Sequence, residues 1–278
     1  MMHVELQPTV ARDKNAAALK RLLSHRAEPL FIADWDRALF IHFEVDPVAL
    51  QREIPFALDL REGRAYVSLV AFTIRGLRLR FGGPLGAWLF KPIASHEFLN
   101  VRTYVQHRGE PGIFFIAEWL ANPLSVRLGP GTFGLPYRSG EMNYEHRHES
   151  GMLRGNVFDA REQNGLGYCA AIPEQPSFES GCEHSLAEFL LERYTAFTSH
   201  KRKRFFRIWH EPWRQTTAEV KLEDDSLLRK EFSWFNKAEL IGANYSPGAR
   251  NVWMGWPHGI KTERQKHVRR FSSFFEMP

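Results

Sequence analysis

The sequence predicts an α+β protein in which antiparallel β-strands predominate. Runs rich in β-branched and aromatic residues recur along the chain, turn sequences separate them, and helical periodicity is confined to a few scattered segments. The sequence has no alternation of strand and helix of the kind that builds a parallel sheet. We therefore expect one domain spanning residues 1–278, with a curved or closed sheet over a core of about 30–256.

The composition is that of a folded protein with a large core. Of the 278 residues, 44% are hydrophobic and 13% aromatic, which argues against disorder. No apolar run is long enough to span a bilayer, and the N-terminal segment lacks the apolar stretch of a secretory signal. Cys169 and Cys182 are too few for a disulfide framework, so two reduced thiols are expected. We expect a cytoplasmic protein without membrane association.

The first 53 residues are expected to form a helix, two strands and a second helix. Residues 14–24 have the pattern of a short peripheral helix. Residues 31–45 are apolar except for Asp34–Arg37, which predicts two strands around a polar turn. Asp46 suits a helix N-cap and the proline after it suits the first helical position, so a short helix is expected over residues 46–53.

The middle of the chain reads as strands. Residues 64–79 are β-branched and aromatic and predict one long strand, whereas residues 82–88 form a Gly/Pro-rich loop sequence. Turn residues separate two apolar runs, at 96–105 and 112–120, and this arrangement predicts a β-hairpin. A second hairpin is expected from two further segments, 141–148 and 152–159.

The C-terminal part mixes both kinds of element. Residues 185–198 have the clearest helical periodicity, and Ser185 with Glu188 has the spacing of a capping box. The remaining predictions are strands at 204–212, 216–222 and 249–256, a short helix at 223–232, and a peripheral basic tail at 257–278.

One predicted strand carries a row of polar side chains. Asn100, Arg102 and Tyr104 alternate with apolar residues and therefore share one strand face. On an open sheet this face would be solvated. Inside a barrel, the arginine would pair with a carboxylate or phosphate. The pattern alone leaves both interpretations open.

Other polar clusters indicate weaker possibilities. His146 and His148 have a spacing that a metal can use, but no third ligand follows, so no metal is expected. The basic run at residues 200–207 includes aromatics and keeps nucleic-acid binding as a minor alternative. The net charge of +5 suits an anionic ligand better than a nucleic acid. No nucleotide-binding or hydrolase motif is present, and no cofactor is expected.

Several segments, taken together, resemble the YqjF-like family of bacterial proteins of unknown function. The resemblance covers about residues 30–256 and rests on FIHFEVDPVALQREIP, GRAYVSLVAFTIRGLR, EFLNVRTYV, FGLPYR and YSPGARNVWMGW, in this order. It implies the acetoacetate decarboxylase-like fold, a closed cone of antiparallel strands around a pocket with a few flanking helices.

The resemblance also implies a change of chemistry. Acetoacetate decarboxylases carry a Pro-Lys-Lys segment whose first lysine forms a Schiff base with the substrate, while the second depresses the pKa of the first. Pro136 matches the proline, Tyr137 falls on the imine-forming lysine and Arg138 on its neighbour. No lysine occurs between Arg102 and His200, and Lys91 is expected in a solvated loop. The resemblance therefore implies a retained pocket without Schiff-base decarboxylation.

Two main hypotheses for the function remain. In the first, the cone binds a small carboxylate or enolate, with Asn100, Arg102 and Tyr104 as ligand-binding residues. In the second, a lyase or hydrolase that needs no imine uses Arg102 with three candidate catalytic residues: Tyr137, Arg138 and Glu141. Glu97 is an alternative base. Of Tyr137 and Arg138, alternation lets one face inward, and Tyr137 is the expected one, its hydroxyl bonded to Arg102 or Glu141.

Overall fold

The computed structural model describes residues 10–260. Its strands are β1 (Phe31–Val45), β2 (Ala57–Leu58), β3 (Ala65–Leu79), β4 (His96–His107), β5 (Glu110–Leu120), β6 (Tyr137–Ser139), β7 (Glu141–Arg147), β8 (Met152–Asp159), β9 (Asn164–Ala171), β10 (Thr195–Thr198), β11 (Arg204–Trp209), β12 (Thr216–Asp224), β13 (Glu239–Met254) and β14 (His258–Gly259). Its α-helices are α1 (Val10–Leu23), α2 (Pro47–Glu53), α3 (Gly83–Phe90), α4 (Pro123–Thr132), α5 (Leu186–Leu191) and α6 (Ser226–Glu231). Its 3-10 helices are η1 (Lys91–Ile93), η2 (His148–Ser150) and η3 (Ser233–Lys237).

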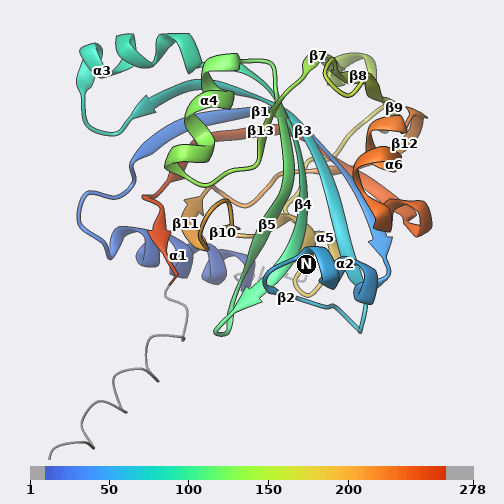
Figure 1. Ribbon diagram of the computed structural model, residues 1–278, viewed down its shortest axis with the longest axis horizontal. Helices are drawn as coiled ribbons and strands as arrows, with labels where there is room; N and C mark the ends of the chain where they lie inside the picture. Colours follow the sequence, from blue (N-terminus) through green and yellow to red (C-terminus); the bar gives the residue numbers. More distant parts are fainter. Residues whose placement is uncertain (1–9, 261–278) are drawn as a thin grey trace, which may run out of the picture.

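The long strands close into a ring (Figure 1). β5, β4, β3, β1 and β13 are antiparallel neighbours in this order. β10 pairs in parallel with β5, and β11 pairs with β10 and, through Ile208 and Trp209, with β13. This last pairing joins the two ends of the row. The predicted α+β class with a mostly antiparallel, closed sheet is therefore confirmed.

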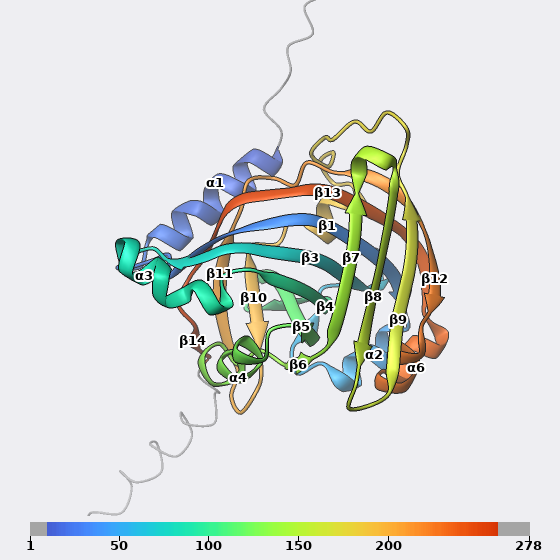
Figure 2. The same ribbon diagram turned by 90° about the horizontal axis from the view of Figure 1, so that it is seen from above.

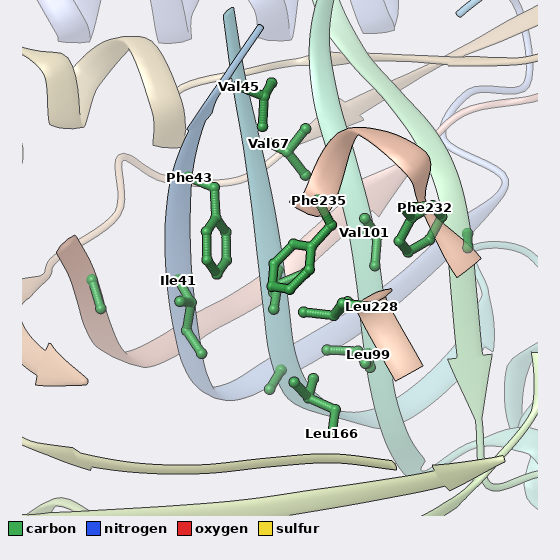
Figure 3. Packing of buried hydrophobic residues seen from close by; sticks show 14 of the residues in the cluster. Ile41, Phe43, Val45, Val67, Leu99, Val101, Leu166, Leu228, Phe232 and Phe235 are labelled. Atoms are coloured by element: carbon green, nitrogen blue, oxygen red, sulfur yellow. The ribbon is translucent and has the colours of Figure 1, made fainter. Parts of the chain in front are cut away.

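A second layer covers one outer face of the ring. β12 pairs with β13, and β9, β8 and β7 follow side by side (Figure 2). Together with α6 and η3, these strands enclose an apolar core against the outer face of β1, β3 and β4. Figure 3 shows this core, in which the ring centroids of Phe43 and Phe235 are 5.4 Å apart.

Alternation along each strand separates this outer core from the interior of the ring. On β4, Leu99 and Val101 belong to the outer core, whereas Asn100 and Arg102 line a cavity inside the ring. The same segment therefore contributes to stability with one face and builds a site with the other.

Most of the expected elements are present at the expected places. β3, the β4–β5 hairpin and the β7–β8 hairpin agree with the predicted segments. α2 begins as its sequence predicts, because Asp46 Oδ1 accepts a hydrogen bond of 2.6 Å from the backbone N–H of Ala49. The helix of α1 also falls on the predicted N-terminal segment.

The prediction of two strands over residues 31–45 is wrong. The segment is a single strand, β1, and its polar residues form an irregularity rather than a turn. Arg37 has a φ of 55°, and the pairing with β3 shifts register between Asp36 and Leu39. A bulge of this kind absorbs additional residues and bends the strand without ending it.

Two further predictions need correction. Residues 82–88 were expected as a loop, but most of them form α3. The helix expected over 185–198 ends at Leu191, and Thr195–Thr198 form β10. β10 fills the gap between β5 and β11, so the pairing that closes the ring overrides the helical periodicity of this segment.

Some elements of the structure were not expected from the sequence. α4 and β9 were not predicted, and β13 begins at Glu239, well before the expected strand at 249–256. Most of the C-terminal tail expected at 257–278 lies outside the described residues. Within residues 10–260, no helix has the length and apolar character needed to cross a membrane.

Candidate functional site

The interior of the ring contains a cavity of about 450 Å³. Aromatic and aliphatic side chains from β1, β3, β4, β5, β11 and α4 form most of its wall. The polar side chains in the wall are few, and the charged or titratable ones are His96, Arg102, Glu118 and Tyr137. A largely apolar cavity with a few convergent polar groups is the usual form of a small-molecule site.

β4 supplies the central row of this wall. His96, Phe98, Asn100 and Arg102 are alternate residues of one strand, and all four line the cavity. Two of the three polar residues expected to share this face, Asn100 and Arg102, therefore point into the ring. The third, Tyr104, does not line the cavity.

Arg102 is a buried cation that has no anionic partner among residues 10–260. The residue is 5% exposed, and its Nη2 donates a 3.0 Å hydrogen bond to the carbonyl oxygen of Leu190 in α5. Its Nε has no hydrogen-bond partner among the described residues, and no carboxylate there forms an ion pair with it. The guanidinium lies 5.4 Å from the ring centroid of Phe40. Both of these contacts to the guanidinium are made by neutral groups.

Tyr104 supports this arrangement from behind. Its hydroxyl donates to the same Leu190 carbonyl at 3.0 Å and lies 2.6 Å from Ser68 Oγ. Ser68 Oγ in turn lies 2.7 Å from Nδ1 of His42. Burial, together with the charge of Arg102, lowers the pKa of His42 to about 3, so this imidazole is neutral near pH 7. The network fixes Arg102 without adding a second charge.

Glu118 is a cavity residue that was not expected from the sequence. It lies on β5 directly opposite Asn100, and Tyr137 of β6 is its register partner on the other side. Glu118 Oε2 and Asn100 Oδ1 are buried and have no hydrogen-bond partner among the described residues. Burial raises the pKa of Glu118 well above its ordinary value, which favours the protonated form.

A β-bulge explains why Glu118 escaped prediction. Strict alternation along residues 113–120 would place Glu118 and Phe115 on opposite faces of β5. The pairing with β4 shifts register, with Val101 opposite Ala117 but Arg102 opposite Phe115, and Ile116 is left unpaired. The extra residue reverses the alternation, so Phe115 and Glu118 both line the cavity. The available signal was a carboxylate within an otherwise apolar run.

Tyr137 lines the cavity as expected, but not with the expected partners. Gly134, with a φ of 73°, turns the chain before β6. β6 then pairs in parallel with β5, and this pairing places Tyr137 beside Glu118. Its ring packs on Gly129 of α4 so closely that a Cβ there would lie 2.2 Å from the ring. Burial and the proximity of Glu118 raise the pKa of Tyr137. Its hydroxyl has no hydrogen bond within residues 10–260, so the expected bond to Arg102 or Glu141 is absent.

The structure places the other two candidate catalytic residues outside the cavity. Arg138 follows Tyr137 on a strand and therefore faces the opposite side, where it pairs with Glu231 of α6 and lies 5.1 Å from the ring centroid of Trp119. Glu141 is exposed at the start of β7. Glu97, the alternative base, faces a separate polar cleft together with Thr73.

His96 lies between this polar cleft and the apolar cavity, because it lines both. Burial lowers the pKa of His96 to about 4, so its imidazole is neutral over the physiological pH range. Lys91 is exposed in η1, and within the described residues no lysine lines the cavity.

The two histidines considered as metal ligands are engaged elsewhere. His146 Nδ1 lies 2.7 Å from the carbonyl oxygen of Arg37 and Nε2 lies 2.8 Å from the Tyr168 hydroxyl. His148 Nδ1 lies 3.0 Å from the Tyr245 hydroxyl. In the described part of the chain, no group of three or more His, Cys, Asp or Glu side chains is arranged to hold a metal ion.

In the basic run at residues 200–207, some side chains bond to other parts of the protein and others are exposed. Arg204 donates a 2.7 Å hydrogen bond to the carbonyl of Thr132, and Arg207 forms a 3.1 Å ion pair with Glu110. Lys201 and Arg202 remain exposed. Among the described residues, the exposed positive charge of this run is therefore limited to a short loop. Cys169 and Cys182 are both free thiols, as expected.

Comparison with known proteins agrees with this architecture. The model of the DUF2071 family, described as an uncharacterized conserved protein, matches residues 32–249. The uncharacterized protein YqjF of Bacillus subtilis (strain 168) is 31% identical over 193 residues, which are 68% of this chain and 76% of that protein.

Solved structures with the same fold are more distant in sequence. Acetoacetate decarboxylase from Legionella pneumophila has a TM-score of 0.55 at 13% identity, covering 94% of this chain and 98% of that one. An acetoacetate decarboxylase-like enzyme from Sphingomonas wittichii RW1 has a TM-score of 0.57 at 15% identity, covering 84% and 94%. The enduracididine biosynthesis enzyme MppR, complexed with pyruvate, has a TM-score of 0.57 at 11% identity, covering 86% and 93%. The chain therefore belongs to the DUF2071 family and has an acetoacetate decarboxylase-like fold, as the resemblance of its sequence implied.

Proposed function

We propose that this protein binds a small carboxylate or enolate inside the ring, with the guanidinium of Arg102 as the anion-binding group and without Schiff-base chemistry. The observation that carries the proposal is the buried charge of Arg102, which forms no ion pair within residues 10–260 and whose Nε has no hydrogen-bond partner there. Burying a charge is costly unless an opposite charge or hydrogen bonds compensate it. A ligand carboxylate would supply both.

The neighbouring polar groups are suited to such a ligand. Arginine binds carboxylates through two parallel N–H donors, and here Nε is available for one of them. Glu118, when protonated, is a hydrogen-bond donor toward a ligand oxygen, and a neutral acid does not repel an anion. Asn100, opposite Glu118, adds an amide to the same wall.

The absence of Schiff-base chemistry rests on two arguments. An imine requires an amine, and no lysine of the described residues lines the cavity. Tyr137, which the family resemblance aligns with the imine-forming lysine, lines the cavity instead. The complex of MppR with pyruvate supports a small keto acid as a ligand type that this fold accepts.

A second candidate function is catalysis without an imine. The adjacent positions of Glu118 and Tyr137 favour it, because a buried acid with a raised pKa next to a phenol is a typical arrangement for proton transfer. In this scheme Arg102 holds the substrate anion, and Glu118 protonates or deprotonates it. Arg138, which pairs with Glu231, is not part of the proposed catalytic group.

The test is calorimetric titration of the wild type, Arg102→Met and Arg127→Met with a panel of monocarboxylates and 2-keto acids. Arg127 is exposed on α4 and does not line the cavity, so Arg127→Met is the matched control. Loss of a charge-assisted pair costs about 1.5–3 kcal/mol, so Arg102→Met should weaken binding by roughly tenfold to a hundredfold. Equal affinities for all three proteins would refute an anion site at Arg102.

The stability of the free protein gives an internal check. Arg102→Met should unfold at the same urea concentration as the wild type or a higher one, because it removes a buried charge that has no anionic partner in the described part of the chain. A folded variant with weakened binding therefore reports on the ligand rather than on the fold. For the catalytic candidate, Glu118→Gln should retain binding and lose turnover.

A further inference from the structure

We propose that the ligand of this cavity is an amphipathic monocarboxylate with an extended apolar chain, bound with its carboxylate at Arg102 and its chain directed along β4 toward α4. This inference rests on the proposed anion site and specifies its ligand class. It comes from the distribution of polar and apolar groups along the cavity.

The end of the cavity at Arg102 is closed. α5 lies across it, because the carbonyl of Leu190 accepts hydrogen bonds from both Arg102 and Tyr104. The next residue toward the helix start, Phe189, packs with its ring centroid 5.2 Å from that of Tyr104. A ligand carboxylate at Arg102 would therefore lie at the bottom of the cavity, with the rest of the molecule pointing the other way.

The opposite end is open and apolar. Leu128 of α4 and Trp256 both line the cavity, yet they are 45% and 46% exposed. α3 and α4 lie on this side of the ring, and α2 and α6 lie on the other side (Figure 2). From Arg102 to His96, near this open end, β4 extends over six residue steps, or about 20 Å at roughly 3.3 Å per step.

The wall between the two ends favours hydrocarbon. Phe72 and Phe98 stack with their ring centroids 5.2 Å apart, and Phe133 and Phe206 form an edge contact at 5.0 Å. All four of these rings line the cavity. A two- or three-carbon acid would satisfy Arg102 but leave this wall uncovered. The volume of about 450 Å³ corresponds to roughly fifteen water molecules at about 30 Å³ each.

An apolar chain would gain affinity from this wall at each added carbon. The transfer of one methylene group from water to an apolar site corresponds to about a three- to fourfold gain in affinity. The gain should continue until the chain reaches the exposed rim at Leu128, and end there because further carbons remain in water.

The experiment is titration of the full chain with straight-chain carboxylates from acetate to dodecanoate, below their micelle concentrations, with the matching primary alcohols as uncharged probes. We expect the dissociation constant to fall about three- to fourfold per methylene before it levels off, and each alcohol to bind at least tenfold more weakly than its acid. The stoichiometry should be one.

A matched pair of variants localises the chain. Leu124 and Leu128 lie one turn apart on α4 and are 44% and 45% exposed, but only Leu128 lines the cavity. Leu128→Glu should weaken dodecanoate binding at least fivefold and leave butanoate unchanged, whereas Leu124→Glu should change neither. Both substitutions are at exposed positions, so the fold should tolerate them.

The possible results separate this inference from the proposed function. If all carboxylates bind with similar affinity and Arg102→Met abolishes their binding, the anion site stands and the extended-chain ligand is wrong. If no carboxylate binds, or alcohols bind as tightly as acids, the anion site itself is wrong. If Leu124→Glu weakens dodecanoate as much as Leu128→Glu does, the chain binds an outer surface and the inference is overturned.

Discussion

Asn100 and Glu118 lie directly opposite each other on β4 and β5, and both line the cavity inside the ring. Each has a buried oxygen atom without a hydrogen-bond partner among the described residues. Buried polar atoms of this kind are rare in folded proteins and are destabilising unless something else binds them. The pair therefore belongs to the part of the cavity wall at which we propose that a ligand binds.

Glu118→Gln tests the protonation state of this pair. Because the folded protein raises the pKa of Glu118 above 4.5, the unfolded chain ionises first as the pH rises, and the wild type loses stability from about pH 4.5 toward the folded-state pKa. Glutamine has the same shape and no such titration. Urea unfolding should therefore show similar stabilities at pH 4 and an advantage of Glu118→Gln that grows as the pH rises above about 4.5. A constant difference across this range would mean that Glu118 is not protonated in the fold.

Gly129→Ala tests whether α4 holds Tyr137 in place. A Cβ at residue 129 would lie 2.2 Å from the Tyr137 ring, so alanine must displace either the ring or the helix. We expect a loss of about 1–3 kcal/mol in unfolding free energy and weaker ligand binding. Gly131→Ala is the control, since nothing lies within 4 Å of its added Cβ and alanine favours the helix by up to ~1 kcal/mol. A neutral Gly129→Ala would contradict the close packing described here.

Tyr137→Phe separates structural from functional use of the phenol. The hydroxyl of Tyr137 has no hydrogen bond within the described residues, so its removal should change the unfolding free energy by less than about 0.5 kcal/mol. If the phenol contacts the ligand, the same variant should lower ligand affinity or turnover. Thermal unfolding with calorimetric titration gives both values. A clear loss of stability in the free protein would show that the hydroxyl has a structural partner.

Borohydride reduction tests the absence of imine chemistry. No lysine of the described residues lines the cavity, so incubation with acetoacetate and borohydride should leave the mass of the intact protein unchanged. Carbon dioxide release from acetoacetate should not exceed the rate without protein. A reduced adduct on any lysine, located by peptide mass spectrometry, would overturn the proposal.

The opposite orientations of Tyr137 and Arg138 follow from a rule that applies to the sequence alone. Neighbouring residues of a strand point to opposite faces, so one of the two had to leave the cavity. The same rule placed Asn100 and Arg102 together, and the structure puts both at the cavity wall. Tyr104 shares their face but lies beyond the closed end, where α5 covers it. How far a row of side chains extends into a site is decided by elements distant in sequence.

Local chemistry determined much of this protein directly. The β-branched runs produced the long strands, the turn residues between them produced the hairpins, and Asp46 produced the start of α2, because each depends on residues that are neighbours in the chain. Tertiary structure alone decided three other features. The bulge at Ile116 turned Glu118 inward, because the pairing with β4 sets the register. Thr195–Thr198 became a strand because β5 and β11 offered unpaired edges. Among the described residues Arg102 has no counter-charge, because the fold brings the neutral carbonyl of Leu190 to its guanidinium, and such a pairing depends on residues that meet only in the folded protein.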